Sequence, residues 1–416
     1  MRISARANSL KPSSTVAVMN RAKALKAQGV DVLNFSAGEP DFNSPQRAKD
    51  AAIAAISANQ TRYIETAGDL ASRELIAGFL RERNRIPGVT ADHVIITSGV
   101  KMALYMAFQC LFDVPAGDQE AQELLLPVPA WVSFAPMAQL AGAKVVELPT
   151  TPESDFKITP EQLRGAITPR SRALLINSPS NPCSTMYTPD ELRALAEVVA
   201  EASRTVAPDL VIVSDELYQN IVFGDVPFAS IGSFASVSER TITINGPGKS
   251  FAMTGWRLGW ASGSGEFGKK VVSAMTKLQG QSTTCVPAFC LAGLREALSH
   301  CQSDLEVMRA AFAVRGALMY DLLRAVPGVK VARPMGAFYV FPDISAHLHR
   351  TSAGGRLLSG AADFAAALLD EQQVAVVPGE DFGSMGHRHV RMSFACGEDQ
   401  IRKGIARLNA FIAGLR

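Results

Sequence analysis

Short, continuously hydrophobic runs alternate with amphipathic segments between residues 46 and 300, and turn residues separate them. Runs of this length predict buried strands, and the longer amphipathic segments predict helices. Strands that are apolar on both faces are typical of a parallel sheet covered by helices on each side. The predicted strands cover residues 94–97, 124–126, 144–147, 172–177, 210–214 and 241–244. The predicted helices cover residues 45–58, 70–83 (capped by Asp69), 100–111, 134–141 and 188–202.

The pattern changes after about residue 300, where helices and short strands no longer alternate regularly. The sequence predicts helices over 305–323, 361–371 and 398–415, and strands over 329–331, 337–341, 374–377 and 390–394. Residues 1–45 add a helix over 14–28 and a strand over 32–35. We therefore expect an α/β protein with a large domain at 46–300, a smaller α+β domain at 301–416, and an N-terminal segment, 1–45, that joins the small domain.

Composition narrows the possible functions. A chain of 416 residues suits two domains, and 47% hydrophobic with 19% charged residues is a globular balance. A net charge of +2 does not indicate a nucleic-acid or anionic membrane partner. The N-terminus lacks the apolar core of a signal peptide, and no apolar run reaches the roughly 20 residues that span a bilayer. The six cysteines lack metal-binding spacing, so we expect reduced thiols, no bound metal and a cytoplasmic location.

Three polar residues follow predicted strands, and they suggest where the chemistry takes place. Asn181, Asp215 and Lys249 each come shortly after a strand, and ligands of parallel sheets collect at the carboxyl ends of strands. Lys249 follows a turn cluster, Asn245-Gly-Pro-Gly248. Burial lowers the pKa of an amine, which suits a lysine to imine formation with an aldehyde. A solvated loop lysine is the alternative interpretation.

A series of motifs then indicates a family. They are Leu10-Lys-Pro-Ser-Ser-Thr15, Ala37-Gly-Glu-Pro-Asp-Phe42, Ser98-Gly-Val-Lys-Met-Ala-Leu-Tyr105, Trp131-Val-Ser-Phe134, Asn177-Ser-Pro-Ser-Asn-Pro182, Ser214-Asp-Glu-Leu-Tyr218, Ala252-Met-Thr-Gly-Trp-Arg-Leu-Gly259, Val376-Val-Pro-Gly379 and His389-Val-Arg-Met-Ser393. Over nearly its whole length the sequence resembles the fold type I pyridoxal-phosphate aminotransferases. Within them it is similar to the bacterial-type aspartate aminotransferases of class I and the related prephenate aminotransferases.

The resemblance implies a pyridoxal 5′-phosphate site and a role for each matched residue. Lys249 would form a Schiff base with the cofactor aldehyde and then transfer the proton. Asp215 would pair with the protonated pyridine nitrogen, which a buried carboxylate needs as a partner. Tyr218 and Asn181 would hydrogen-bond the phenolic oxygen. Trp131 would stack on the ring, although a core tryptophan is the alternative.

The phosphate group would lie at a helix N-terminus. Gly99, Val100 and Lys101 would offer backbone N–H groups and the helix dipole, and Arg257 would add a bidentate contact. Tyr63 would reach the phosphate of a neighbouring subunit. The resemblance therefore implies a homodimer with shared active sites.

The substrate would be held through its carboxylates. Arg391 would bind the α-carboxylate beside the Gly38 backbone, with Trp131 and Asn181 close to the substrate; Arg388 and Arg333 are alternatives to Arg391. No arginine occurs in 278–285, where animal-type aspartate enzymes carry one for the distal carboxylate. In the bacterial-type subgroup a threonine and a lysine serve instead, and Thr15 and Lys101 match them.

We expect ping-pong transfer of an amino group between aspartate or glutamate and 2-oxoglutarate or oxaloacetate. Prephenate is the near alternative as acceptor, and a broader aromatic or neutral aminotransferase is another. Two other classes are a fold type I lyase and a non-catalytic regulator. The regulator would need a DNA-binding domain, for which residues 1–30 are too short.

Three stretches depart from the family pattern. Cys183-Ser184 stands where Thr-Gly is usual, and Gly248, after Pro247, stands where a serine usually precedes the lysine. Lost hydroxyl groups at these positions could weaken phosphate or turn contacts. Residues 114–123 form an insertion-like stretch, for which we expect an exposed loop.

Overall fold

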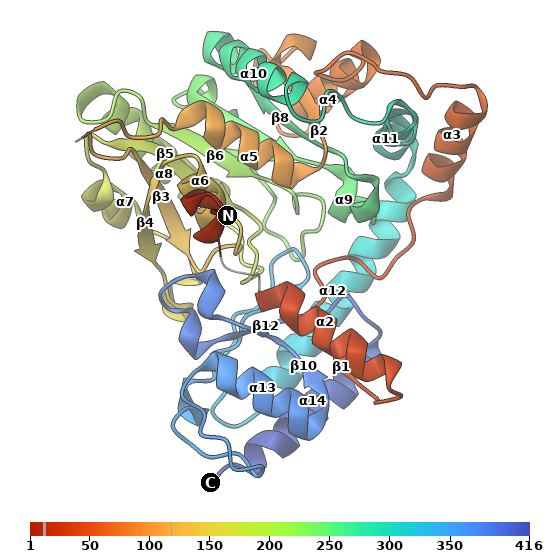
Figure 1. Ribbon diagram of the computed structural model, residues 1–416, viewed down its shortest axis with the longest axis vertical. Coiled ribbons are helices and arrows are strands. Elements are labelled where there is room, and N and C mark those ends of the chain that lie inside the picture. The colour runs from red at the N-terminus through yellow and green to blue at the C-terminus, as the bar shows by residue number, and fades with distance from the viewer. Residues whose placement is uncertain (11–13, 118) are drawn as a thin grey trace.

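The computed structural model describes residues 1–10, 14–117 and 119–416, without the side chains at positions 14 and 15. A larger unit with a central sheet lies above a smaller unit that contains the C-terminal part of the chain (Figure 1). The long helix α12 (Gln302–Arg324) runs from one unit into the other. The domain boundaries given above stay a prediction.

The larger unit contains a seven-stranded sheet with the order β2-β8-β7-β6-β5-β3-β4. Only β8 runs antiparallel to its neighbours, so the predicted mostly parallel sheet is confirmed. Its strands are β2 (Val94–Thr97), β3 (Glu123–Val128), β4 (Lys144–Pro149), β5 (Ser171–Asn177), β6 (Val211–Asp215), β7 (Thr241–Asn245) and β8 (Gly259–Gly263). The carboxyl ends of β5, β6 and β7 therefore meet at one edge of the sheet.

Strand β8 did not emerge from the sequence pattern, and its position depends on a close backbone approach. A Cβ atom on Gly259 would lie 2.4 Å from the backbone nitrogen of Val100. Only glycine lets β8 pass this close to the start of helix α5 (Val100–Leu111). Because Arg257 comes two residues before β8, this approach brings its side chain to the N-terminus of α5.

Helices cover both faces of the sheet, as its apolar strands predict. Helices α5, α6 (Phe134–Leu140) and α10 (Gly265–Gly280) pack on one face, and α7 (Pro160–Ala166) and α8 (Pro189–Thr205) pack on the other. Helix α8 begins with a capping box, in which Glu191 N–H donates to Thr188 Oγ1 (3.2 Å) and Thr188 N–H donates to Glu191 Oε2 (2.7 Å). The remaining helices of at least four residues outside the smaller unit are α1 (Ala5–Asn8), α3 (Gln46–Ser57), α4 (Leu70–Glu82), α9 (Pro247–Ser250) and α11 (Ala288–His300).

The smaller unit combines two small sheets with helices. Strand β1 (Leu33–Asn34) of the N-terminal segment pairs with β10 (Val374–Ala375), and β12 (Val390–Ser393) lies between β11 (Val377–Pro378) and β9 (Tyr339–Val340). Helices α2 (Ser14–Ala27), α13 (Ala361–Gln372) and α14 (Glu398–Ala413) surround them, together with α12 (Figure 1).

Two strand predictions in the smaller unit were wrong. Residues 329–331 form only an isolated bridge between Lys330 and Asp343, because no neighbouring strand continues the pairing. Residues 374–377 do not form one strand, since the chain leaves one sheet at Ala375 and enters the other at Val377. In the insertion-like stretch, the described residues up to Gln122 contain no helix or strand and are mostly exposed, as expected, whereas Glu123 is buried and begins β3. Among the described residues, no helix is long and apolar enough to cross a membrane.

Candidate active site

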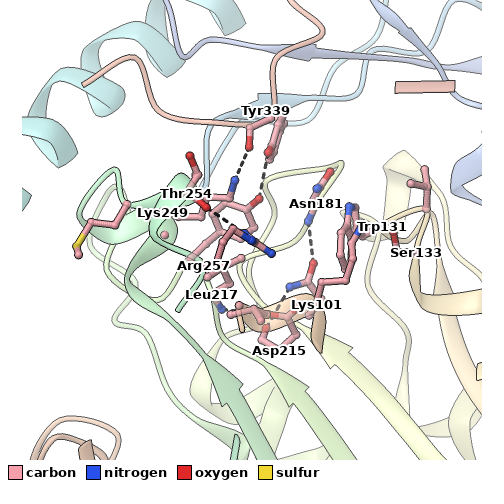
Figure 2. Close-up of a pocket in the computed structure, with 18 of the residues that line it drawn as sticks. Lys101, Trp131, Ser133, Asn181, Asp215, Leu217, Lys249, Thr254, Arg257 and Tyr339 are labelled. Atoms are coloured by element: carbon pink, nitrogen blue, oxygen red, sulfur yellow. Dashed lines mark hydrogen bonds between the residues drawn. The ribbon is translucent and has the colours of Figure 1, made fainter. Parts of the chain in front are cut away.

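A cavity of about 400 Å³ opens at the carboxyl ends of the strands, between the large sheet and the smaller unit. Figure 2 shows Asp215 at the strand ends, Tyr339 of the smaller unit on the opposite side, and Lys249 between them. Most of the predicted site residues line this cavity: Gly38, Gly99, Val100, Lys101, Trp131, Asn181, Asp215, Tyr218, Lys249, Arg257 and Arg391. The cavity therefore brings together predicted site residues that are as far apart in the sequence as Gly38 and Arg391.

Pairing of neighbouring strands places two of these residues together. Asn177 and Asp215 are register partners at the ends of β5 and β6. The Asn177 side chain donates to the Asp215 carbonyl oxygen (3.1 Å) and accepts from the Asn181 N–H (2.9 Å). Asn177 thus ties the loop that carries Asn181 to the strand that carries Asp215, a role that its place at a strand end could have indicated.

The Asp215 carboxylate is 4% exposed and lacks a cationic partner among the described residues. Its Oδ1 accepts from the Leu217 N–H (3.1 Å). Burial raises the pKa of Asp215 to about 7. A buried carboxyl group of this kind is stabilised in its ionised form by a ligand that brings a positive charge.

Lys249 lies in the short helix α9, which begins at Pro247, so the turn expected at 245–248 ends two residues earlier than predicted, at Gly246. Proline favours the first helical position, which explains the early start. The Lys249 ammonium group donates to the Gly38 carbonyl oxygen. Burial, opposed by nearby Glu39, lowers the pKa of Lys249 to about 8, so the amine loses its proton more easily than a solvated lysine does.

The N-terminus of α5 forms an anion site. Its first turn leaves the N–H groups of Val100 and Lys101 without intrahelical acceptors. Gly99 has φ +92°, and a Cβ atom there would lie 2.6 Å from the Arg257 guanidinium nitrogen Nη2. Arg257 also donates to the Thr254 carbonyl oxygen (2.9 Å). Free N–H groups, the helix dipole and a guanidinium group together suit a phosphate.

Arg391 on β12 is 2% exposed, and the described residues supply no carboxylate to pair with it. It donates to Asn181 Oδ1 (3.2 Å) and to the Ser36 carbonyl oxygen (3.0 Å), while its Nε lacks a partner in the described part of the chain. Its guanidinium carbon lies 4.7 Å from the Tyr339 ring centroid and 5.4 Å from that of Phe382. The site thus holds a positive charge for an incoming carboxylate.

The alternative arginines lie elsewhere. Arg388 approaches Asp343 at 3.9 Å, and Arg333 lies over the Tyr320 ring. Neither lines the cavity. This geometry favours Arg391 as the carboxylate-binding arginine.

Aromatic side chains complete the walls. The Lys101 ammonium lies 4.9 Å from the Trp131 ring centroid, and partial burial, with nearby Arg257, lowers the pKa of Lys101. The Tyr218 and Tyr339 hydroxyl groups are 3.0 Å apart. Tyr339 was not among the predicted site residues, because it stands between Phe338 and Val340 in a stretch that has the pattern of a core strand.

One predicted residue does not line this cavity, and the side chain of another lies outside the described residues. Tyr63 lies in a loop with 85% of its surface exposed and does not line the cavity of its own chain. The Thr15 side chain lies outside the described residues, whereas the next residue, Val16, lines the cavity. Within the described residues, no group of three or more His, Cys, Asp or Glu side chains could hold a metal ion.

Comparison with known proteins identifies the family. The family model for aminotransferase class I and II matches residues 30–408. The chain belongs to the class I and II aminotransferases. It is 40% identical to an aspartate aminotransferase of Geobacillus stearothermophilus over 99% of each chain. It is also 40% identical to an aspartate/prephenate aminotransferase of Thermus thermophilus over 97% of each chain.

The structure is similar to that of an aspartate aminotransferase from Thermus thermophilus with maleate, with a TM-score of 0.88 and 38% identity. That match covers 99% of this chain and 100% of the other. The recognised family and the fold type I architecture are confirmed, and this aminotransferase uses pyridoxal phosphate. The residues fit the cofactor, because the described part of the chain gives Asp215 no cationic partner, the α5 N-terminus can take a phosphate, and Lys249 has a lowered pKa.

The buried Asp215 carboxyl predicts a pH-dependent stability in the cofactor-free protein. Its folded-state pKa, about 7, is above the ordinary value of 3.8, so the folded state binds the proton more tightly. Asp215 therefore destabilises the fold increasingly as pH rises from about 4 to about 7. We expect Asp215→Asn to raise the melting temperature of the cofactor-free protein, with a gain that grows over this range and is constant above it.

Asp225→Asn, at an exposed carboxylate, provides the matched control and should give no such gain. Melting curves of both variants between pH 4.5 and 8.5 measure the difference. A gain for Asp215→Asn that is independent of pH would contradict the assignment of Asp215 as an unpaired buried carboxyl.

Proposed function

We propose that this aminotransferase moves an amino group between aspartate or glutamate and a 2-oxo acid such as 2-oxoglutarate or oxaloacetate. The observation that carries the proposal is a pair of cations at one cavity, Arg391 and Lys101, for which the described residues supply no carboxylate partner. Two such cations match the two carboxylates of a dicarboxylic substrate. The names of relatives, aspartate aminotransferase among them, support the same choice.

Different residues of the cavity have different roles in the proposed reaction. When bound, pyridoxal phosphate withdraws electrons from the substrate α-carbon. Lys249 Nζ, made less basic by burial, takes the proton from that carbon and returns it later. Arg391 orients the substrate through its α-carboxylate, next to Asn181. The aromatic rings of Trp131, Tyr218 and Tyr339 in the walls lower the local dielectric constant, which strengthens these charged contacts.

The other residues would bind the cofactor. Asp215 would pair with the ring nitrogen, since it needs a cation, and Tyr218 would donate to the phenolic oxygen. Gly99, Val100 and Arg257 would hold the phosphate at the start of α5. Trp131 would cover one face of the ring.

Prephenate is the second candidate substrate. It also carries two carboxylates, so the same cations suit it. Relatives named aspartate/prephenate aminotransferase, from Cereibacter sphaeroides and Thermus thermophilus, share 40% identity with this chain. Assays with prephenate, oxaloacetate and 2-oxoglutarate as acceptors rank these activities. Release of ammonia without any acceptor would indicate a lyase instead.

The proposed assembly is a homodimer in which Tyr63 of each chain reaches the phosphate bound by the other. The exposure of Tyr63, 85%, supports this role, because a tyrosine ring so exposed leaves its hydroxyl free for a partner. The proposed location is the cytoplasm, and six cysteines without disulfides support a reducing compartment.

Covalent attachment is the first test of the mechanism. We expect borohydride reduction of the cofactor-loaded enzyme, followed by peptide mapping, to place the pyridoxyl group on Lys249. Lys249→Ala should lower kcat by several orders of magnitude, because no other side chain takes over the proton transfer. A label on any other lysine would refute the assignment.

Lys101 tests the dicarboxylate specificity. In a partly dry site a hydrogen bond to a charged group contributes about 1.5–3 kcal/mol, so Lys101→Met should cost roughly 10- to 150-fold in kcat/KM for aspartate and glutamate. Alanine and phenylalanine as donors lack the second carboxylate and should be much less affected. An equal loss for both groups of donors would mean that Lys101 serves the phosphate or the fold.

Shared active sites predict complementation between two inactive variants. Tyr63→Ala removes the contact to the neighbouring site, and Lys249→Ala removes the base of its own site. Mixed dimers should regain part of the activity, because one of their two sites contains both residues. Hybrid dimers without activity, formed from a clearly impaired Tyr63→Ala chain, would argue that each site is built by one chain.

A further inference from the structure

Ser184 occupies a position where the backbone is unfavourable for a side chain. It has φ +57°, a left-handed conformation that glycine adopts at lower cost. The residue is fully buried, and its Oγ accepts a hydrogen bond from the Tyr339 N–H (2.9 Å). The Ser184 carbonyl oxygen also accepts from the N–H groups of Met335 (2.8 Å) and Gly336 (3.2 Å). Ser184 therefore ties the loop after Asn181 to the segment that leads into β9.

Tyr339, the residue held by this hydroxyl, contacts both halves of the site. Its hydroxyl lies 3.0 Å from that of Tyr218, beside the cofactor position. Its ring lies 4.7 Å from the guanidinium carbon of Arg391, on the substrate side. The pairing of β9 with β12, with Tyr339 opposite Ser393, brings Tyr339 and Arg391 together. Figure 2 shows Tyr339 across the cavity from Asp215.

We propose that Ser184 and Tyr339 form a positioning pair that aligns the substrate-binding Arg391 with the cofactor-binding Tyr218. This proposal adds a positioning role to the proposed function. It rests on two parts of that function, namely that Arg391 binds an α-carboxylate and that Tyr218 binds the phenolic oxygen. Every amino acid carries an α-carboxylate, so the pair acts on all donors alike, in contrast to Lys101.

The hydrogen bond between the two tyrosines has a defined direction in the working enzyme. Tyr218 has a single hydroxyl proton, and it needs that proton to donate to the cofactor. Tyr339 must then donate to the Tyr218 oxygen, which strengthens the hydrogen bond that Tyr218 donates in turn. The Tyr339 ring meanwhile restricts the guanidinium group of Arg391 by a cation–π contact.

Tyr339→Phe tests the hydroxyl and leaves the ring in place. We expect the pH midpoint of the absorbance band of the bound cofactor to rise by about 0.3 to 1 pH unit, because Tyr218 then donates less strongly. We also expect kcat/KM to fall about 3- to 10-fold for dicarboxylic and neutral amino donors alike, the range for one hydrogen bond. The absorbance titration reports the loss without turnover.

Ser184→Gly and Ser184→Ala distinguish an effect on the position of Tyr339 from an effect on the stability of the fold. Both remove the hydroxyl, so both should shift the absorbance midpoint in the same direction as Tyr339→Phe. Their melting temperatures should differ, because glycine relieves the positive φ and alanine does not. In the double variant with Tyr339→Phe, Ser184→Ala should add no further shift, since its effect passes through the Tyr339 hydroxyl.

Ser178→Ala is the matched control. The hydroxyl group of Ser178, in the same loop, also accepts from a backbone N–H, that of Tyr187 (3.2 Å), and forms no hydrogen bond with Tyr339. It should alter stability without moving the midpoint. The proposal is overturned if Ser178→Ala shifts the midpoint as Ser184→Ala does, if Tyr339→Phe leaves it unchanged, or if the loss in kcat/KM is confined to dicarboxylates. A wild-type enzyme that forms a cofactor band but does not use dicarboxylates would refute the proposed substrate instead.

Discussion

Unpaired buried charge is the constraint on which this site depends. Asp215 and Arg391 lie in one cavity, and the described residues give neither of them a partner of opposite charge. Removing such groups from water costs several kcal/mol per ion after relaxation. The fold therefore has to hold both side chains in place by packing and by hydrogen bonds to neutral groups. A cofactor with a cationic ring nitrogen and a substrate with a carboxylate would supply the missing charges.

A buried network of polar side chains lies next to the carboxyl ends of β6 and β7. Glu216, next to Asp215, accepts hydrogen bonds from Asn84 Nδ2 (2.6 Å), Ser214 Oγ (2.8 Å) and Ser230 Oγ (2.6 Å). Burial raises the pKa of Glu216 to about 7. Gln219 Oε1 in turn accepts from Asn84 and Asn245, both at 2.8 Å, and so connects the ends of β6 and β7. Satisfied networks of this kind rigidify what they surround, which here is the backbone that presents Asp215 and leads to Lys249.

The sequence predicted those parts of the structure that depend on local patterns. Apolar runs located β2 and β5 to β7, and polar residues just after those strands identified Asn181, Asp215 and Lys249 as neighbours. Features that depend on pairing between distant segments were missed. Strand β8 can lie beside the start of α5 because Gly259 allows a close backbone approach, and residues 374–377 divide between two sheets because β1 and β12 offer separate partners. Both features depend on residues far apart in the sequence, so a pattern of about ten consecutive residues does not reveal them.

Tyr339 and Ser184 show why part of the site escapes such reasoning. Tyr339 belongs to an aromatic stretch whose neighbour Phe338 is fully buried, so its hydroxyl group is the only sign that it faces a cavity. Ser184 differs from the usual glycine by a hydroxymethyl group, and from the sequence alone this is only a departure from the family motif. In the structure the same hydroxyl accepts from Tyr339, more than 150 residues away along the chain, across the junction of the two units. Comparison with a family motif shows which chemical groups the sequence lacks. The role of an added group, such as the Ser184 hydroxyl, depends on its partner, which only the folded structure shows.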